Sequence, residues 1–189
     1  MAVKGWFEIP GVVEGQRTFE QQTMGLGLLL DLPMGGASVL DLGCAEGLIS
    51  LACKERGAGR VDGVDYNKGV IFTARSLAEE RGLDVGFYHA DLGLDWPAPL
   101  ADKYDIVLAL AIIHKITAPL PFIKKLCARA QKSVIVRLPH GSTGMTKGKH
   151  WPYQKCNVPV EMRKHGFELQ EETQGPNNER VQYYGAEQA

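Results

Sequence analysis

The sequence predicts an α/β fold with a mostly parallel sheet, and three observations favour it. The segment Val39 to Ser50 joins a short apolar strand to a helix through a turn that contains glycine. Two later strands, at 60–65 and 84–90, each run into an acidic residue. The run 104–110 is apolar almost throughout, as expected of a parallel strand that is covered on both faces.

The chain is expected to start with a helical cap at 1–37, followed by one compact domain at 38–189. A helix is predicted at 16–30 from near-helical apolar spacing, which Gly25 and Gly27 weaken. The next elements in order are strand 38–42, helix 47–57, strand 60–65, helix 67–81, strand 84–90, strand 104–110, helix 119–130 and strand 133–138.

Glycine, proline and other turn-forming residues indicate the connections between elements and the C-terminal hairpin. Gly82 closes the helix at 67–81, and a Trp-Pro-rich stretch at 96–99 predicts a crossover with little helix. After a short helix at 158–165, strands at 167–173 and 180–186 flank a QGPNNE turn. These two strands are expected to form an antiparallel hairpin.

Composition is consistent with one small domain of balanced charge. A chain of 189 residues can bury roughly 70% of its unfolded surface around one core. With 21 basic and 22 acidic residues, no overall field attracts nucleic acid or a membrane, although local basic patches remain open. The four cysteines lack C-x-x-C spacing, and there is neither a signal peptide nor an apolar run of membrane-spanning length. We therefore expect reduced thiols, no metal site, no membrane association and a cytoplasmic location.

The turn after the first central strand is typical of a cofactor loop. Gly43 and Gly47 permit close backbone approach, and the following helix directs free amides into the turn. Carboxylates at Asp41 and Glu46 suit a pyrophosphate badly and suit a cofactor with a cationic end, such as S-adenosylmethionine. The structural alternative is tight packing between strand and helix.

Two further acids fit the other parts of an adenosine. Asp65 lies 22 residues after Gly43 at the tip of the next strand, where a carboxylate can accept hydrogen bonds from ribose hydroxyls. Its alternative role is to stabilise a helix N-terminus. Asp91 with Leu92 offers adenine an acceptor and an apolar wall, although a loop aspartate is often a turn residue. Asp62 is expected on the solvated surface.

The ordered series VLDLGCAEG, VDGVDY, FYHADL and YDIVLALAIIHKI resembles the class I S-adenosylmethionine-dependent methyltransferases over about residues 38–139. The resemblance implies a Rossmann-like, doubly wound sheet of seven strands, with S-adenosyl-L-methionine across the strand ends and methyl transfer by direct displacement. The implied cofactor residues are Asp41, Gly43, Cys44, Ala45 and Glu46 for the methionine, Asp65 and Tyr66 for the ribose, and Asp91 and Leu92 for the adenine. Gly47 in the turn and Ala109 near the end of the fourth strand complete this predicted site. Ala45 stands where the common motif has a second glycine.

The methyl acceptor is less well defined by the sequence. No N-P-P-Y or D-P-P-Y follows the fourth strand, which argues against methylation of DNA base amines. The paired glutamates of arginine methyltransferases are not recognisable, and neither is the Lys-Asp-Lys-Glu set of ribose methyltransferases. The fourth-strand region is similar to that of small-molecule methyltransferases and of a family acting on the wobble uridine of transfer RNA. A small-molecule acceptor is the leading hypothesis; an RNA or protein acceptor, or a non-catalytic partner subunit, stays open.

His114 is the candidate catalytic residue because it follows the fourth strand. An imidazole with a pKa near ~6.5 could take the acceptor's proton, and it could equally bind the acceptor or cap a helix. The basic and aromatic segment 140–155 is expected to be a binding loop, a lid or a mobile surface loop. Arg137 is expected to face the site or to pair with a carboxylate. Trp6, Phe7 and Arg17 could cover the cofactor or pack in the core.

Overall fold

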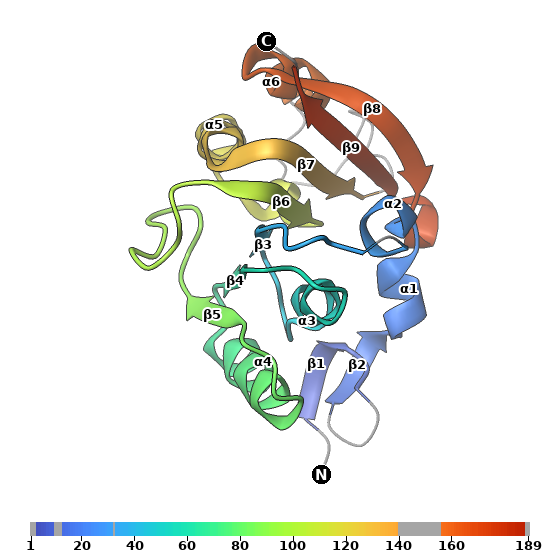
Figure 1. Cartoon of the computed structure of the whole chain (residues 1–189). Helices are drawn as coiled ribbons and strands as arrows, with labels where there is room; N and C mark the ends of the chain where they lie inside the picture. The colour runs from blue at the N-terminus through green and yellow to red at the C-terminus, as the bar shows by residue number, and fades with distance from the viewer. Residues whose placement is uncertain (1–2, 10–12, 32, 140–155, 188–189) are drawn as a thin grey trace.

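A seven-stranded sheet organises the chain in the computed structural model, which describes residues 3–9, 13–31, 33–139 and 156–187. Across the sheet the strands are β5 (Gly86–His89), β4 (Val61–Asp65), β3 (Val39–Leu42), β6 (Tyr104–Leu110), β7 (Ala130–Leu138), β9 (Arg180–Ala186) and β8 (Phe167–Gln174). Figure 1 shows this row running from β5 at the lower left to β8 at the upper right. The pairs from β5 to β7 are parallel and β9 is antiparallel to both of its neighbours, which confirms the predicted fold class.

Helices lie on both faces of the sheet, as a doubly wound fold requires. The helices are α3 (Leu48–Glu55), α4 (Lys68–Glu80), α5 (Pro119–Arg129) and α6 (Val158–Lys164). Apolar residues of α3 and α4 pack in clusters with one set of strand residues, whereas those of α5 and α6 pack with the alternate set, including Leu40 and Leu42 of β3. The central strands β3 and β4 are buried along their whole length, as expected of parallel strands covered on both faces.

The N-terminal prediction is wrong in its secondary structure. In place of one helix at 16–30, strands β1 (Val3–Phe7) and β2 (Val13–Arg17) pair, and two short helices follow, α1 (Phe19–Thr23) and α2 (Gly27–Leu30). A capping box in which Thr18 and Gln21 bond each other's backbone amides starts α1 at residue 19. Gly25 then adopts a φ of +80°, and a Cβ there would lie 2.8 Å from the carbonyl oxygen of Gln174, so a continuous helix cannot form. A boundary at residue 37 between cap and domain stays a prediction.

The other predicted elements agree with the structure within about three residues at each end. Gly82, at φ +62°, follows the C-cap of α4 as expected, and the segment between β5 and β6 contains no helix. Two single-turn 3₁₀ helices, η1 (Ile113–Lys115) and η3 (Pro176–Asn178), were not predicted. Among the described residues, no helix is both long and apolar enough to cross a membrane.

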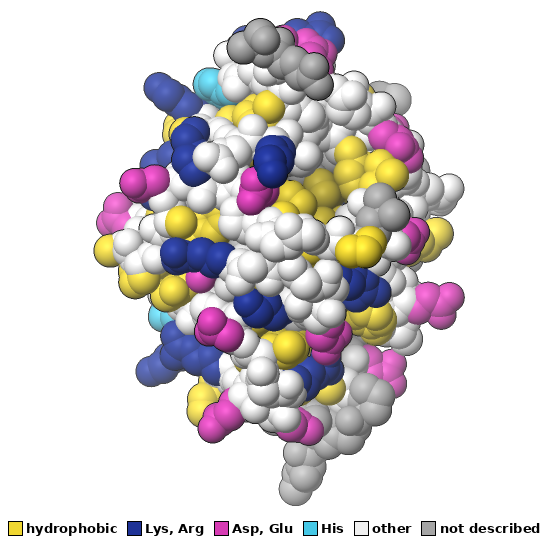
Figure 2. Space-filling view, viewed as in Figure 1, with side chains coloured by type: hydrophobic (Ala, Val, Ile, Leu, Met, Phe, Trp, Pro, Cys, Tyr) yellow, Lys and Arg dark blue, Asp and Glu magenta, His cyan; other side chains and the backbone are white. Residues whose placement is uncertain are grey.

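The surface in Figure 2 carries interspersed acidic and basic side chains, consistent with the balanced charge of the sequence. Apolar side chains gather where α2 meets β9, around a groove of about 370 Å³ whose wall includes Leu28, Met34 and Tyr183. None of the predicted site residues lines this groove.

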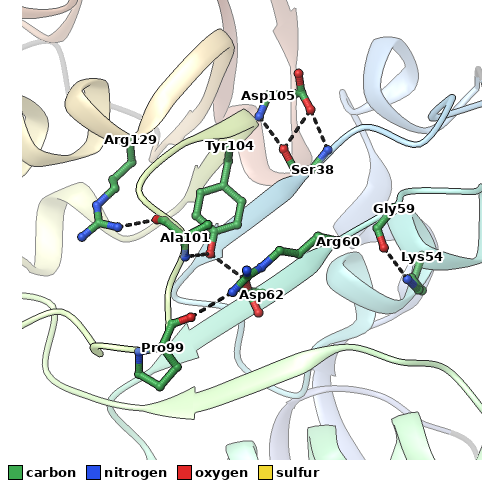
Figure 3. Close-up of polar contacts among 10 residues, drawn as sticks. All are labelled: Ser38, Lys54, Gly59, Arg60, Asp62, Pro99, Ala101, Tyr104, Asp105 and Arg129. Atoms are coloured by element: carbon green, nitrogen blue, oxygen red, sulfur yellow. Dashed lines mark hydrogen bonds and ion pairs between the residues drawn. The ribbon is translucent and has the colours of Figure 1, made fainter.

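A polar network fixes the amino ends of the central strands (Figure 3). The Tyr104 hydroxyl donates a 2.5 Å hydrogen bond to Asp62 and accepts one from the amide of Ala101, while Arg60 also donates to Asp62. Asp62 is 3% exposed, so the expectation that it lies on the solvated surface is wrong. Its charge is stabilised in a buried position because two donors face it. The network joins β4 to β6 at the edge of the sheet opposite the strands' carboxyl ends.

Removing the Tyr104 hydroxyl should destabilise the fold. In Tyr104→Phe, the buried Asp62 carboxylate loses one of its donors, so we expect a loss of about 1–3 kcal/mol in the free energy of unfolding, measured by urea denaturation. Tyr66→Phe is the matched control, because the Tyr66 side chain is 62% exposed and should change stability by less than about 0.5 kcal/mol. Equal stability of the two variants would show that the network contributes nothing.

Candidate functional site

The carboxyl ends of the parallel strands surround a cavity of about 720 Å³. This is the edge at which open α/β sheets bind ligands, because the loops after adjacent strands diverge there. The predicted site residues that line it are Asp41, Gly43, Cys44, Ala45, Asp65, Tyr66, Asp91, Leu92 and His114. Four strands that are distant in sequence therefore bring their predicted residues to one cavity.

Three predicted residues, Glu46, Gly47 and Ala109, do not line the cavity. Glu46 is buried against the N-terminal segment, where its Oε1 accepts a 2.8 Å hydrogen bond from the amide of Trp6. Gly47 precedes α3 at φ +78°, and a Cβ there would lie 2.5 Å from the ring of Phe87. Ala109 is fully buried in β6, and the next residues, Leu110 and Ala111, reach the cavity instead.

The turn after β3 is held against the end of β4. The amide of Gly43 donates a 2.7 Å hydrogen bond to the carbonyl of Val64, and Gly43 lies at φ +80°. Ala45 also has a positive φ, +49°, a conformation that is strained for a residue with a Cβ. The backbone thus accepts local strain where it faces the cavity.

Asp65 connects this turn to the segment after β4. Its Oδ2 accepts a hydrogen bond from the amide of Ala45 at 3.1 Å, and its Oδ1 accepts one from the amide of Asn67 at 2.9 Å. The side chain is buried and lines the cavity. Asn67, not Asp65, caps α4, because its side chain accepts from the amides of Gly69 and Val70. Asp65 therefore contacts the N-terminus of α4 only through the amide of the capping residue, Asn67.

Asp41 is a buried acid beside this carboxylate. Burial raises its pKa to about 6, the hydrogen bond from the Ser50 hydroxyl at 2.7 Å opposes that change, and the negative charge of Asp65 adds to it. Near pH 6 this carboxyl is therefore in equilibrium between its two forms, and a bound cation would favour the ionised form. Burial raises the pKa of the neighbouring Cys44 thiol well above its usual range, so Cys44 is a neutral wall residue.

Asp91 is a turn residue that also lies in the cavity wall. Its Oδ1 accepts a 2.8 Å hydrogen bond from the amide of Gly93, which is the geometry of a turn residue. It also lines the cavity next to Leu92, which is buried.

His114 lies in η1, where burial is the main influence on its titration. Burial, together with the positive charge of Lys115, lowers its pKa to about 4. The expected value near 6.5 is thus wrong for this environment, and His114 is neutral at physiological pH. A neutral imidazole can accept a proton or a hydrogen bond, although its basicity is reduced.

The N-terminal segment and the last hairpin contribute wall residues that the sequence identified only in part. Arg17 of β2 donates to both oxygens of Glu179, at 2.6 and 3.1 Å, and the Nε of Arg137 lies 3.8 Å from the same carboxylate. This confirms that Arg137 pairs with an acid. Nζ of Lys115 lies 4.7 Å from the ring centre of Trp6, which also lines the cavity.

Gln16, Gln22 and Glu179 were not predicted as wall residues, because no local motif marks them. Trp6, Phe7 and Arg17 do line the cavity, as one of the two alternatives stated. The predicted binding loop at 140–155 lies outside the described residues. Within the described ranges, no three His, Cys, Asp or Glu side chains are arranged to hold a metal ion.

Comparison with known proteins gives a consistent family. Residues 39–133 match the family described as methyltransferase domain. The ribosomal protein L11 methyltransferase of Dictyoglomus thermophilum is 32% identical over 100 residues, which cover 53% of this chain and 32% of that protein. The ubiquinone biosynthesis O-methyltransferase of Ruegeria sp. is 31% identical over 96 residues, covering 51% of this chain and 38% of that protein. The matched part of the chain thus spans only about a third of the length of these relatives.

Solved structures share the fold at lower sequence identity. Magnesium protoporphyrin IX methyltransferase of Synechocystis PCC 6803, with bound SAH, superimposes with a TM-score of 0.70 at 21% identity, covering 92% of this chain and 89% of that one. A putative S-adenosylmethionine-dependent methyltransferase of Listeria monocytogenes gives 0.67 at 18% identity, covering 86% and 96%.

The raised pKa of Asp41 predicts a pH-dependent gain in stability for Asp41→Asn. The folded protein holds the Asp41 proton up to about pH 6 and the unfolded chain only to about 3.8, so wild-type stability decreases as pH rises between these values. The advantage of Asp41→Asn in unfolding free energy should therefore grow by on the order of 3 kcal/mol from pH 4 to pH 7, measured by urea denaturation.

Asp105→Asn is the control of opposite sign. The hydrogen bonds from Lys132 and Ser38 lower the pKa of Asp105 to about 2, so its contribution is present above pH 4 and is lost as pH falls towards 2. The deficit of Asp105→Asn should thus shrink on acidification. A constant difference between Asp41→Asn and wild type across pH 4–7 would contradict the proposed titration of Asp41.

Proposed function

Since this chain belongs to the class I S-adenosylmethionine-dependent methyltransferases, we propose that it methylates a small-molecule acceptor in the cavity at the strand ends. One observation carries the proposal: Asp41, Asp65 and Asp91 lie at or near the carboxyl ends of three strands of the sheet and line one cavity. This acidic wall suits the cationic, phosphate-free cofactor and would repel a pyrophosphate.

The wall residues fit the parts of this cofactor. Asp41 is a buried acid whose ionised form a cationic group would favour. Asp65 is fixed by two backbone amides and presents its remaining acceptor capacity to ribose hydroxyls. Asp91 and Leu92 combine an acceptor with a buried apolar surface for adenine. Glu46, which is engaged with Trp6, has no part in this assignment.

The protein's main contribution to the reaction is alignment. When bound, S-adenosylmethionine supplies an electrophilic methyl group and a neutral thioether leaving group. The acceptor must lie in line with that group, and alignment alone can contribute several kcal/mol. Ile112, His114 and Ile116 line the cavity beyond the end of β6, where they can orient an acceptor. His114 is neutral and can take the acceptor's proton during transfer.

The enclosure of the cavity favours a small acceptor. Trp6 and Phe7 from β1 and Arg17 from β2 line it opposite the strand ends, and its volume of about 720 Å³ is within the range of small-molecule sites. A relative named for ubiquinone biosynthesis also favours a small acceptor. An RNA or protein acceptor is the second candidate, since another relative is named for ribosomal protein L11. The four cysteines are free and buried, which supports the predicted cytoplasmic location.

Incubation with methyl-labelled S-adenosylmethionine and fractionated cell extract tests the acceptor class. Label in the small-molecule fraction would support the proposal, and label in RNA or protein would favour the second candidate. Binding of the methyl donor without any transfer would indicate a non-catalytic partner subunit.

Cofactor identity gives a direct binding prediction. By calorimetry the protein should bind S-adenosylmethionine or S-adenosylhomocysteine and not NAD. Asp65→Asn should weaken that binding by about 1–3 kcal/mol, because an amide accepts more weakly than a carboxylate. Asp84→Asn removes the same charge from an exposed position outside the cavity and should leave affinity unchanged. Preference for NAD, or equal affinity of both variants, would contradict the assignment.

The role of His114 is separable by its pH dependence. His114→Gln should lower kcat by about 10²–10⁴-fold if the imidazole accepts the proton, with cofactor affinity retained. Because its pKa is lowered to about 4, the wild-type rate should not vary with His114 titration between pH 5.5 and 8, and should fall only below about pH 5.

His165→Gln, a histidine outside the cavity wall, is the control and should match wild type. If His114→Gln raised KM with kcat unchanged, His114 would position the acceptor without taking its proton. A rate and pH profile identical to wild type would exclude both roles.

A further inference from the structure

Two buried donor atoms of residues in the cavity wall make no hydrogen bond among the described residues. Gln22, in α1, is 1% exposed, and its Nε2 makes no hydrogen bond. Arg137, in β7, is 3% exposed, and its Nε makes none either. Both residues line the cavity. Buried donors without hydrogen bonds are uncommon and destabilising, so ligand oxygens that accepted from them would recover that free energy.

The two donors belong to one cluster. The guanidinium of Arg137 donates through its second terminal nitrogen to the carbonyls of Gln22 and Met24, which holds the end of β7 against α1. Its Nε lies 3.8 Å from Glu179, beyond hydrogen-bond distance. These contacts hold Gln22 and Arg137 next to each other and leave the Nε2 of Gln22 and the Nε of Arg137 without a hydrogen bond.

The guanidinium groups of the cluster suit an anion. Glu179 is the only carboxylate paired with Arg137 in the described structure, and its two oxygens already accept hydrogen bonds from Arg17. Two guanidinium groups thus share one paired carboxylate, and Asp41 acts on Arg137 only through its charge. A ligand carboxylate would offer Arg137 two acceptor oxygens in one plane, the arrangement that guanidinium donors match best.

We infer that Gln22 and Arg137 bind a carboxylate group in this cavity. The inference rests on the proposed function, which supplies two sources of that group: the amino-acid end of the methyl donor, or the acceptor itself. Asp41 lines the same cavity and Arg137 acts electrostatically on it, so an acid for an ammonium group lies near donors for a carboxylate.

The resonance of the Arg137 Nε–H in ¹⁵N-edited NMR spectra reports the unused donor directly. It is assigned with Arg137→Lys, which keeps the charge and lacks this N–H. Two pairs of compounds separate the sources. The first pair is S-adenosylhomocysteine and 5′-methylthioadenosine, which lacks the amino-acid end. The second pair is benzoate and neutral benzamide, each added to the S-adenosylhomocysteine complex. A shift with S-adenosylhomocysteine but not methylthioadenosine assigns the carboxylate to the methyl donor. A shift with benzoate but not benzamide assigns it to the acceptor.

Gln22→Glu provides an independent test because it replaces the unused donor with a negative charge at nearly constant shape. If S-adenosylhomocysteine or benzoate shifts the Nε–H resonance of the wild type, that compound should bind Gln22→Glu at least about tenfold more weakly. Gln16→Glu places the same charge at an exposed position in the same cavity wall and should have a clearly smaller effect. Circular dichroism checks that both variants fold.

If S-adenosylhomocysteine binds but no probe shifts the Nε–H resonance, or Gln22→Glu and Gln16→Glu behave alike, the inference is wrong and the proposed function stands. If S-adenosylhomocysteine does not bind wild type, the proposed function fails. The benzoate and benzamide titration of the ligand-free protein then still decides whether the corner binds a carboxylate.

Discussion

The position of Asp65 is the constraint on which the site depends. Its carboxylate accepts hydrogen bonds from the backbone of the glycine turn and from the segment that leads into α4, so one side chain fixes two loops relative to each other. Both loops follow parallel strands that end at the same edge of the sheet. A ligand at this edge therefore meets acceptors that are already oriented, and little side-chain ordering remains to oppose binding.

The opposite wall is held by longer-range contacts. Glu46 accepts from the backbone of Trp6, and Arg17 pairs with Glu179, so the N-terminal segment is tied to the start of α3 and to the final hairpin. The cavity at the strand ends is consequently assembled from three regions that are far apart in the chain. Lys115 stacks over Trp6 and joins the region after β6 to this wall.

The sequence predicted the central part of the fold because its signals there are local. Apolar strands that end in Asp65 or Asp91, and a glycine after a helix as at Gly82, specify the elements and the edge to which they carry their acids. The same reasoning gave the wrong secondary structure for the N-terminal segment. Its apolar spacing is compatible with a helix, whereas the actual break at Gly25 depends on contact with Gln174, which is distant in sequence.

The parts of the site that escaped prediction have the same origin. Nothing near Gln22 or Glu179 marks them as wall residues, because only the fold brings them to Arg137. The pKa of His114 likewise depends on burial by neighbours, so the residue type alone gave the wrong value. Most of the residues predicted from a motif line the cavity, whereas Glu46, Gly47 and Ala109 do not, and their neighbours in the turn or strand reach it instead.

The network of Tyr104, Asp62 and Arg60 lies at the amino ends of the strands, and the cavity lies at their carboxyl ends. The residues that anchor the strands are therefore not those that select the ligand. Loops at the cavity edge can diverge in sequence, and relatives can acquire different acceptors, while the anchoring edge is left intact. The same separation makes this chain a suitable scaffold for redesign, because substitutions aimed at acceptor choice need not draw on the interactions that keep the sheet folded.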